Sequence, residues 1–406
     1  MIGVARIQAW SFRCPTPKPV ATSFGIMCDR PAVLVRIEDH DGAFGWGEIW
    51  ANWPAAGAEH RVRLLEMDIA PLLVGTRAQR PEDFFHRLEQ QTQIRATQCG
   101  EIGPFNQVIA GLDIALWDMA ARRSGLPLRR FINGTTTNQV PAYASGIQIA
   151  EAAEVLPRAR TEGHQTFKLK VGFDMAADSS AVYAIQNGLS AFDAIACDAN
   201  QAWSVEQAQR FVTGITGVPL QWLEEPLPVF AQTTQWQSLA QSCPIPLAGG
   251  ENLSGNVEFD DAINLGHLSV IQPDVAKWGG ITGCLGVAKT ALGAGRRYFP
   301  HFLGAGIGLA ASAELLAAVG GDGLLEIDVN DNPLRSLFLL AQSPFRRENG
   351  PATTALDSGL RRSPMRLINT KRSMQKCAEP ASHCQINYHR SATWRRVSPR
   401  PFCALG

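Results

Sequence analysis

The chain has 406 residues, which is enough for two domains and a sizeable hydrophobic core. With 45% hydrophobic and 18% charged residues, its composition is that of an ordinary globular protein, and no apolar run approaches the roughly 20 residues of a membrane-spanning helix. The start of the chain alternates like a strand and lacks the pattern of a secretory signal, so we expect a cytoplasmic protein without a membrane partner.

The zero net charge hides an uneven distribution of charge. Residues 345–406 hold 12 Lys and Arg against 3 Asp and Glu, which leaves 25 against 34 in residues 1–344. A basic end can bind nucleic acid, but this one lacks aromatic interleaving and regular periodicity. We therefore predict that residues 361–406 form a disordered tail without a nucleic-acid partner. Nine scattered cysteines with no C-x-x-C pair argue against zinc or thioredoxin-like chemistry.

The first part of the chain predicts an α+β domain over residues 1–130. Residues 32–38 have the pattern of a strand, residues 39–42 that of a turn, and residues 44–48 resume an extended chain. Helical periodicity follows and places four apolar side chains on one face: Ile109, Leu112, Leu116 and Met119. Gly125-Leu126-Pro127 then ends this helix.

From residue 139 the pattern changes to short apolar strands that alternate with helical stretches, which indicates βαβ units and a parallel sheet. The eight predicted strands are residues 140–145, 166–171, 194–198, 220–224, 245–249, 268–272, 297–302 and 324–328. No glycine-rich nucleotide-binding motif follows the early strands, which argues against an open doubly wound sheet. We predict an α/β fold with a TIM-type (β/α) barrel over residues 131–335.

Polar residues stand at the carboxyl ends of seven consecutive predicted strands. They are Lys168 and Lys170, Asp198, Glu224, Glu251, Asp274, His301 and Glu326. From Lys170 onward they are separated by 28, 26, 27, 23, 27 and 25 residues, the length of one strand-and-helix unit. Because all strands of a barrel point the same way, these side chains meet at the face where barrel enzymes carry their active sites.

Lys168 and Lys170 lie two residues apart, so both point to the same side of a strand while Leu169 faces the helices. Like charge and partial desolvation both disfavour the protonated form. We therefore expect one of the two lysines to have a lowered pKa and to accept a proton. For this pair alone, the alternative is a solvated Lys-x-Lys on an edge strand.

Asp198, Glu224 and Glu251 end three successive predicted strands. Three converging carboxylates repel one another unless a cation neutralises them, and a site with only oxygen ligands suits Mg²⁺ or Mn²⁺ better than zinc. Any one of them alone is more simply a helix cap or a surface charge. At three matching positions they predict a metal site.

Asp274 and His301 end the next two predicted strands. A carboxylate on one ring nitrogen fixes the tautomer and raises the basicity of the other, so His301 becomes a candidate base. A lone histidine between aromatic residues is otherwise a core residue. Glu326 stands in an apolar strand, where we expect burial to raise its pKa and keep it as a neutral hydrogen-bond donor.

Together these residues resemble the mandelate racemase group of the enolase superfamily, over roughly residues 1–340. The Lys-x-Lys, the three carboxylates, the Asp274/His301 pair and Glu326 stand in the order of that family, whereas muconate-lactonising relatives place a lysine at the position of Asp274. The resemblance implies a modified, enolase-like barrel with the first domain as a cap over its mouth. It also implies substrate-selecting loops near residues 22–30 and 47–60 and a return segment to the cap over residues 336–360.

The resemblance further implies Mg²⁺-dependent removal of the α-proton of a small carboxylate through a metal-stabilised enediolate. In this reading Lys170 and His301 are bases on opposite faces, Lys168 lies against the substrate carboxylate and Glu326 hydrogen-bonds the enediolate. Both dehydration and racemisation or epimerisation of a hydroxy acid or acid sugar stay open. The alternative is a non-catalytic metal-binding barrel. Since relatives are often multimers, we also expect a homo-oligomer.

Overall fold

The computed structural model describes residues 1–22, 25–338 and 392–393, and within them an antiparallel sheet opens the chain. Its strands run in the order β14-β2-β3-β4. They are β2 (Arg6–Thr22), β3 (Gly25–Glu38), β4 (Phe44–Ile49) and the short β14 (Ala392–Thr393). The predicted disordered tail therefore lies outside the described residues except for β14, which pairs with β2.

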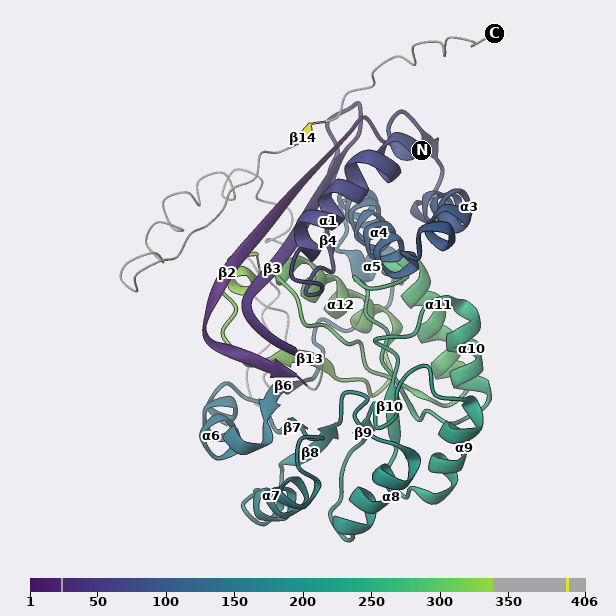
Figure 1. The fold of residues 1–406 in the computed structure, drawn as a ribbon. Coiled ribbons are helices and arrows are strands. Elements are labelled where there is room, and N and C mark those ends of the chain that lie inside the picture. Colours follow the sequence, from purple (N-terminus) through teal and green to yellow (C-terminus); the bar gives the residue numbers. More distant parts are fainter. Residues whose placement is uncertain (23–24, 339–391, 394–406) are drawn as a thin grey trace.

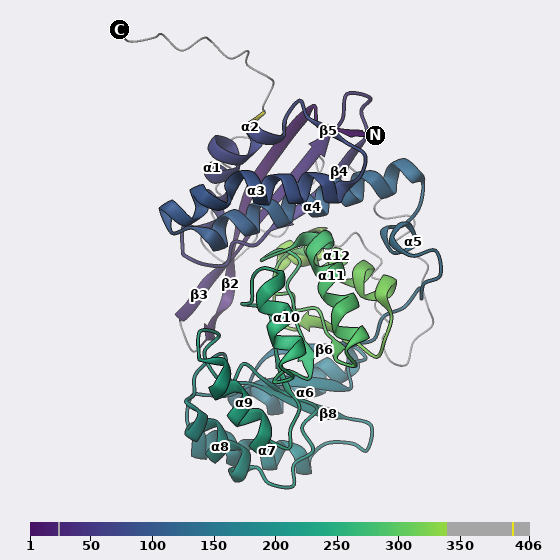
Figure 2. The same cartoon turned by 90° about the vertical axis from the view of Figure 1, so that its right-hand side faces the viewer.

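Helices of the first domain cover one face of this sheet (Figure 2). They are α1 (Gly57–Leu64), the π-helix η1 (Leu65–Ile69), α2 (Ala70–Leu73), α3 (Pro81–Cys99) and α4 (Ile102–Ser124). A two-stranded pair, β1 (Ile2–Gly3) and β5 (Arg77–Ala78), lies beside them. Helix α4 packs directly on β4. The two backbones are so close that a side chain on Gly47 would collide with the carbonyl oxygen of Gly111, so this position needs glycine.

After α5 (Leu128–Ile132), eight parallel strands form one curled sheet in the order β12-β11-β10-β9-β8-β7-β6-β13. They are β6 (Ala142–Gln148), β7 (Thr166–Lys170), β8 (Ala194–Asp198), β9 (Leu223–Glu224), β10 (Leu247–Gly249), β11 (Val270–Ile271), β12 (Arg297–Tyr298) and β13 (Leu325–Asp328). Each of the eight predicted strands overlaps one of them, which confirms the predicted α/β barrel with an α+β cap.

The two ends of the curled sheet approach each other. The backbone N–H of Phe302, just after β12, donates to Glu326 Oε2 on β13 at 3.1 Å. A side chain on Gly323 would collide with the carbonyl oxygen of Tyr298. These contacts bring the two edge strands of the sheet, β12 and β13, together and close the barrel on the side of His301 and Glu326.

Helices surround the barrel (Figure 1). They are η2 (Ile149–Glu151), α6 (Ala152–Thr161), α7 (Met175–Asn187), α8 (Val205–Gly214), α9 (Thr233–Ser242), α10 (Asn256–Asn264), α11 (Gly280–Gly293), α12 (Gly306–Val319) and α13 (Pro333–Phe338). The predicted return segment over residues 336–360 lies outside the described residues beyond the end of α13. Among the helices so described, none is long and apolar enough to cross a membrane.

Large side chains fill the inside of the barrel below its mouth. Ala196, Trp222 and Phe299 belong to one buried cluster, in which the rings of Trp222 and Phe299 lie 5.3 Å apart, edge to face. Each of the three stands two residues before a predicted site residue. Because side chains of a strand alternate, this spacing turns Asp198 and Glu224, and after β12 also His301, toward the same interior.

Two buried acids attach the cap to the barrel. Glu48 of β4 accepts hydrogen bonds from the backbone N–H groups of Ala305 (2.5 Å) and Gly308 (2.8 Å), at the start of α12. Asp113 of α4 accepts from the N–H of Thr282 at 2.9 Å, at the start of α11. Each carboxyl therefore caps a barrel helix from outside the barrel. Burial raises the pKa of Glu48 to about 7 and that of Asp113 to about 8.

Candidate active site

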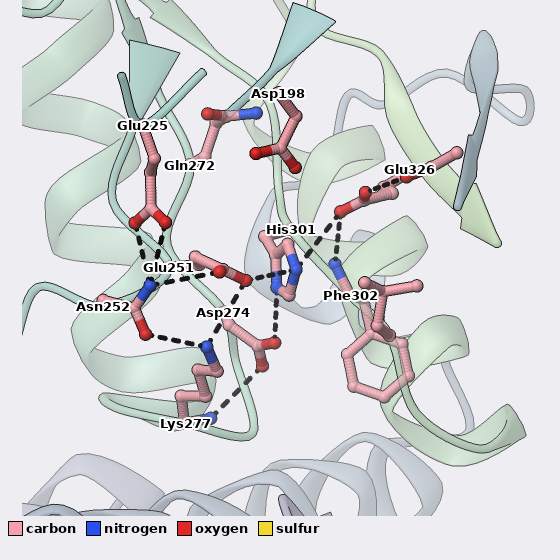
Figure 3. A network of polar contacts seen from close by, with 12 residues as sticks. Asp198, Glu225, Glu251, Asn252, Gln272, Asp274, Lys277, His301, Phe302 and Glu326 are labelled. Atoms are coloured by element: carbon pink, nitrogen blue, oxygen red, sulfur yellow. Dashed lines mark hydrogen bonds and ion pairs between the residues drawn. The ribbon is translucent and has the colours of Figure 1, made fainter. Parts of the chain in front are cut away.

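The structure brings all eight predicted site residues together at the carboxyl ends of the barrel strands. Seven of them are almost fully buried: Lys168, Lys170, Asp198, Glu224, Asp274, His301 and Glu326. The side chain of the eighth, Glu251, is 13% exposed. They form a continuous network of hydrogen bonds and ion pairs, the His301 side of which is drawn in Figure 3.

The two lysines of β7 point into the barrel, each onto carboxylates of its neighbours. Lys168 Nζ lies 2.5 Å from Glu224 Oε1 and 2.7 Å from Glu326 Oε1. Lys170 Nζ lies 2.6 Å from Asp198 Oδ2. Neither lysine is the solvated residue of an edge strand, since β7 lies between β6 and β8.

The predicted lowering of a lysine pKa is wrong for this arrangement. Burial does lower the pKa of both lysines, but the negative carboxylates outweigh it. Glu224 and Glu326 raise the pKa of Lys168 well above its usual value, and Asp198 raises that of Lys170. Like-charge repulsion between the lysines is the smaller effect because each has an acid within hydrogen-bond distance.

His301 lies between two carboxylates. Its Nδ1 is 2.8 Å from Asp274 Oδ2, and its Nε2 pairs with Glu251. Asp274 is itself fixed, since its Oδ1 accepts the backbone N–H of Ala276 at 2.8 Å. Although burial lowers the pKa of His301, Glu251 and Glu326 raise it to about 10. The direction agrees with the predicted increase in basicity, although Glu251 and Glu326 contribute more to it than the predicted partner Asp274.

Glu326 differs from its prediction. Burial raises its pKa, but the nearby charges of Lys168 and His301 outweigh burial, and the pKa is lowered. Its Oε1 also accepts the hydroxyl of Ser145 at 2.5 Å. Glu326 is therefore an ionised carboxylate and not the expected neutral donor. The apolar pattern of its own strand could not show this, because its charged partners Lys168 and His301 come from other parts of the chain.

Acids outnumber bases in this network. Six carboxyl groups, of Asp198, Glu224, Glu225, Glu251, Asp274 and Glu326, face four basic groups, of Lys168, Lys170, Lys277 and His301. If all ten groups were ionised, two negative charges would remain uncompensated. Burial raises the pKa of two of these acids, to about 7 for Glu224 and about 8 for Glu225, so protons can take up this surplus in the absence of a cation. A single divalent cation would neutralise this surplus.

The donor chemistry fits Mg²⁺, although the carboxylates do not form a ready-made ligand cluster. Asp198, Glu224 and Glu251 offer oxygen atoms only, which is the set that Mg²⁺ prefers. Within the part of the chain that the structure describes, however, no three His, Cys, Asp or Glu side chains are arranged to hold a metal ion. Their oxygens are turned instead to Lys168, Lys170 and His301.

Several residues of the network were not predicted from the sequence. Glu225 follows Glu224 directly with a left-handed backbone (φ 39°), and its carboxylate accepts both contacts from Asn252 Nδ2, at 2.8 and 3.1 Å. Lys277 Nζ lies 3.3 Å from Glu251 Oε2 and 5.0 Å from the centre of the Trp50 ring. The sequence signal for Glu225 was its place directly after Glu224, in Glu224-Glu225-Pro226. Strand alternation hides this signal, because it predicts that only one of two adjacent acids faces inward.

A cavity of about 70 Å³ lies over this network, between the barrel and the cap. Lys170, Glu251, Lys277 and His301 line it from the barrel. The cap contributes residues from both segments that the sequence singled out as substrate loops: Thr22, Met27, Arg30, Trp50, Asn52 and Trp53. Lys170, Glu251 and His301 therefore face a small space that both domains build.

Two family models match the chain. The model of the mandelate racemase / muconate lactonizing enzyme N-terminal domain matches residues 6–133, and the enolase C-terminal domain-like model matches residues 149–360. Together they span the cap and the barrel.

Two curated relatives illustrate the similarity. The chain is 28% identical over 375 residues to D-galactarolactone cycloisomerase of Agrobacterium fabrum, which covers 88% of this chain and 95% of the relative. It is 35% identical over 277 residues to L-talarate/galactarate dehydratase of Salmonella typhimurium, which covers 66% of this chain and 67% of the relative.

Solved structures have the same fold. A mandelate racemase/muconate lactonizing enzyme from Bordetella bronchiseptica RB50 is 44% identical, with a TM-score of 0.79 over 90% of this chain and 98% of that one. A racemase from Streptomyces coelicolor A3(2), solved with bound magnesium, is 26% identical, with a TM-score of 0.72 over 80% of this chain and 89% of that one.

Proposed function

Because the chain belongs to the mandelate racemase / muconate lactonizing enzyme family of the enolase superfamily, we propose that its barrel mouth removes the α-proton of a small acid sugar or hydroxy acid. It is an enzyme of the dehydratase or racemase/isomerase kind, like its relatives.

The observation that carries this proposal is the pairing of two different proton-transfer groups across one cavity. Lys170 stands on β7 and His301 follows β12, five strands further along the sheet, yet both line the same 70 Å³ space. Two groups that reach a bound carbon from separate strands can act on its opposite faces. One breaks the C–H bond and takes the proton, and the other returns a proton to the opposite face or to a leaving group.

We assign Mg²⁺ to Asp198, Glu224 and Glu251, whose surplus charge and oxygen donors fit it. When bound, Mg²⁺ would supply the positive charge that makes the α-proton of a carboxylate acidic enough for a side-chain base. Lys170 and His301 would then have to release Asp198 and Glu251, the acids that now raise their pKa values. The magnesium in a related racemase structure supports this assignment.

The remaining residues hold the substrate in this proposal. Lys168 donates a hydrogen bond to the substrate carboxylate. Glu326 Oε1 lies 2.7 Å from Lys168 Nζ, where it positions the ammonium group and the carboxylate oxygen of the substrate. Asp274 keeps His301 in one orientation through Nδ1. Because Asp274 holds Nδ1, His301 is placed to give a proton from Nε2 to a departing β-hydroxyl. This favours dehydration of an acid sugar, with epimerisation as the second outcome of the same first step.

The test is a deuterium-exchange screen. A panel of hydroxy acids and acid sugars is incubated with the protein and Mg²⁺ in deuterated water, and the α-carbon is examined by NMR. We expect label, or a dehydrated product, with at least one acid and neither when Mg²⁺ is withheld. No label on any acid, with Mg²⁺ demonstrably bound, would favour the alternative of a non-catalytic metal-binding barrel.

The homo-oligomer and the cytoplasmic location expected from the sequence remain predictions.

A further inference from the structure

The three carboxylates proposed to bind the cation have one pattern of hydrogen bonds in common: a neutral group holds one oxygen of each. In Asp198, Oδ1 accepts the backbone N–H of Asn200 at 2.8 Å. In Glu251, Oε1 accepts Nδ2 of Asn252 at 3.1 Å. In Glu224, Oε2 is held in the same way, by two side chains. One oxygen of each carboxylate is therefore occupied by N–H groups of the protein.

Gln272 and Trp222 hold Glu224 from two parts of the sheet. Gln272, directly after β11, places Nε2 2.6 Å from Glu224 Oε2, and Trp222, directly before β9, places Nε1 3.0 Å from the same oxygen. All three side chains are almost fully buried. Among the described residues, Oε1 of Gln272 has no hydrogen-bond partner, so the contact with Glu224 is what orients this amide. If the amide were turned over, two acceptor oxygens would face each other, which leaves Nε2 as the donor.

The second oxygen of each carboxylate faces a basic side chain. The pairs are Asp198 Oδ2 with Lys170, Glu224 Oε1 with Lys168, and Glu251 Oε2 with His301. These three oxygens already attract positive charge, whereas the other oxygen of each carboxylate is taken by a neutral N–H group. A cation that replaces the basic side chains would therefore find one oxygen of each acid available and the other occupied.

From this pattern we infer that Gln272 and Trp222 are positioning residues, which restrict Glu224 to one ligand oxygen and thereby make the site select Mg²⁺ over Ca²⁺. The inference rests on the proposed function, which assigns the cation to the three carboxylates. Mg²⁺ needs a near-octahedral shell with oxygens at about 2.0–2.1 Å, whereas Ca²⁺ takes about 6–8 oxygens and accepts both oxygens of one carboxylate. A carboxylate whose second oxygen is occupied therefore suits Mg²⁺ better.

The test compares the affinities of the two ions with and without the amide donor. The full chain is freed of metal with EDTA and titrated with MgCl₂, and separately with CaCl₂, in a calorimeter. In Gln272→Met the side chain keeps its length but has no N–H group, so Glu224 Oε2 becomes available. We expect the Mg²⁺ affinity to fall about tenfold to hundredfold, the usual effect of losing a residue that orients a metal ligand. The Ca²⁺ affinity should not fall with it, because a second oxygen becomes free, so the ratio of Mg²⁺ to Ca²⁺ affinity should fall.

A second variant and a matched control separate this effect from a loss of folding. Trp222→Phe removes the other donor but keeps an aromatic ring against Tyr143 and Phe299, whose rings lie 5.0 and 5.3 Å from that of Trp222. It should lower the affinity ratio in the same way. Gln107→Met makes the same change as Gln272→Met at a buried glutamine of α4 in the cap, and it should leave the ratio as it is. Circular dichroism of the metal-free variants shows whether each is folded.

The outcomes distinguish this inference from the proposed function, because the titrations contain no substrate. An affinity ratio that is unchanged in the folded variants, or that falls equally in Gln107→Met, overturns the inference even where α-proton exchange occurs. A ratio that depends on Gln272 and Trp222, without exchange at any α-carbon, supports the inference and refutes the proposed proton transfer. Absence of Mg²⁺ binding to the unmodified protein overturns both.

Discussion

At the level of single residues, the protonation of each side chain in the barrel mouth depends on partners from other strands. The regular spacing from Lys170 to Glu326 follows from one strand and one helix per unit, so their meeting could be predicted from the chain. Whether the pKa of a lysine or histidine is raised or lowered depends on which carboxylate oxygens lie within about 3 Å of its nitrogen. Lys168 contacts Glu224 and Glu326, 56 and 158 positions away, and no local pattern encodes those distances.

Replacing His301 separates the two proposed proton-transfer groups. In His301→Asn the asparagine keeps a polar side chain but cannot exchange a proton. We expect net turnover to fall by about 10²–10⁴, the usual contribution of a general acid or base. Exchange of the α-proton that Lys170 removes should persist in deuterated water and is followed by NMR. The complementary variant Lys170→Met should lose that exchange, and loss of all exchange in both variants would contradict a two-group mechanism.

At the level of elements, the strands were predicted more reliably than their limits. Residues 220–224 were predicted as one strand, whereas β9 comprises only Leu223–Glu224. Gln221 still donates its N–H to Ile195 of β8 at 2.9 Å, so the chain approaches the sheet before it pairs regularly. The contacts that fix the cap were not predictable, because Glu48 and the α12 residues it caps are more than 250 positions apart.

Glu48 should make stability depend on pH. Its pKa rises from 4.5 in a free side chain to about 7 in the folded protein. Between these values the folded state holds a proton that the unfolded state has released, so stability falls as pH rises through this window. We expect urea unfolding at pH 5 and pH 8 to give a difference of up to about 3 kcal/mol from this group.

Glu48→Gln should remove that part of the pH dependence because an amide does not titrate. The control Asp260→Asn changes an exposed acid on α10 and should leave the dependence as it is. If the pH profiles of Glu48→Gln and the unmodified protein coincide, the carboxyl group is ionised in both states and this explanation is wrong.

At the level of the whole molecule, binding of a cation should stabilise the fold. A ligand that binds only the folded state adds about 2.7 kcal/mol at a hundredfold excess over its Kd. We expect Mg²⁺ to raise the Tm, and EDTA to reverse the effect, in thermal unfolding followed by circular dichroism. Asp198→Asn should greatly reduce the Mg²⁺ effect, while Asp260→Asn should retain it. An unchanged Mg²⁺ response in Asp198→Asn would remove that residue from the metal site.

The hydrogen bonds between cap and barrel fall on one part of the ring. Glu48 and Asp113 hold the starts of α12 and α11, and Arg30 holds the end of β13, whereas α7, α8 and α9 lie far from the helices of the cap (Figure 2). Asp198 and Glu224 stand on β8 and β9, within that remote part. Displacement of the cap during substrate entry would thus disturb the histidine side first, together with Glu251, whereas Asp198 and Glu224 could keep their positions while product leaves.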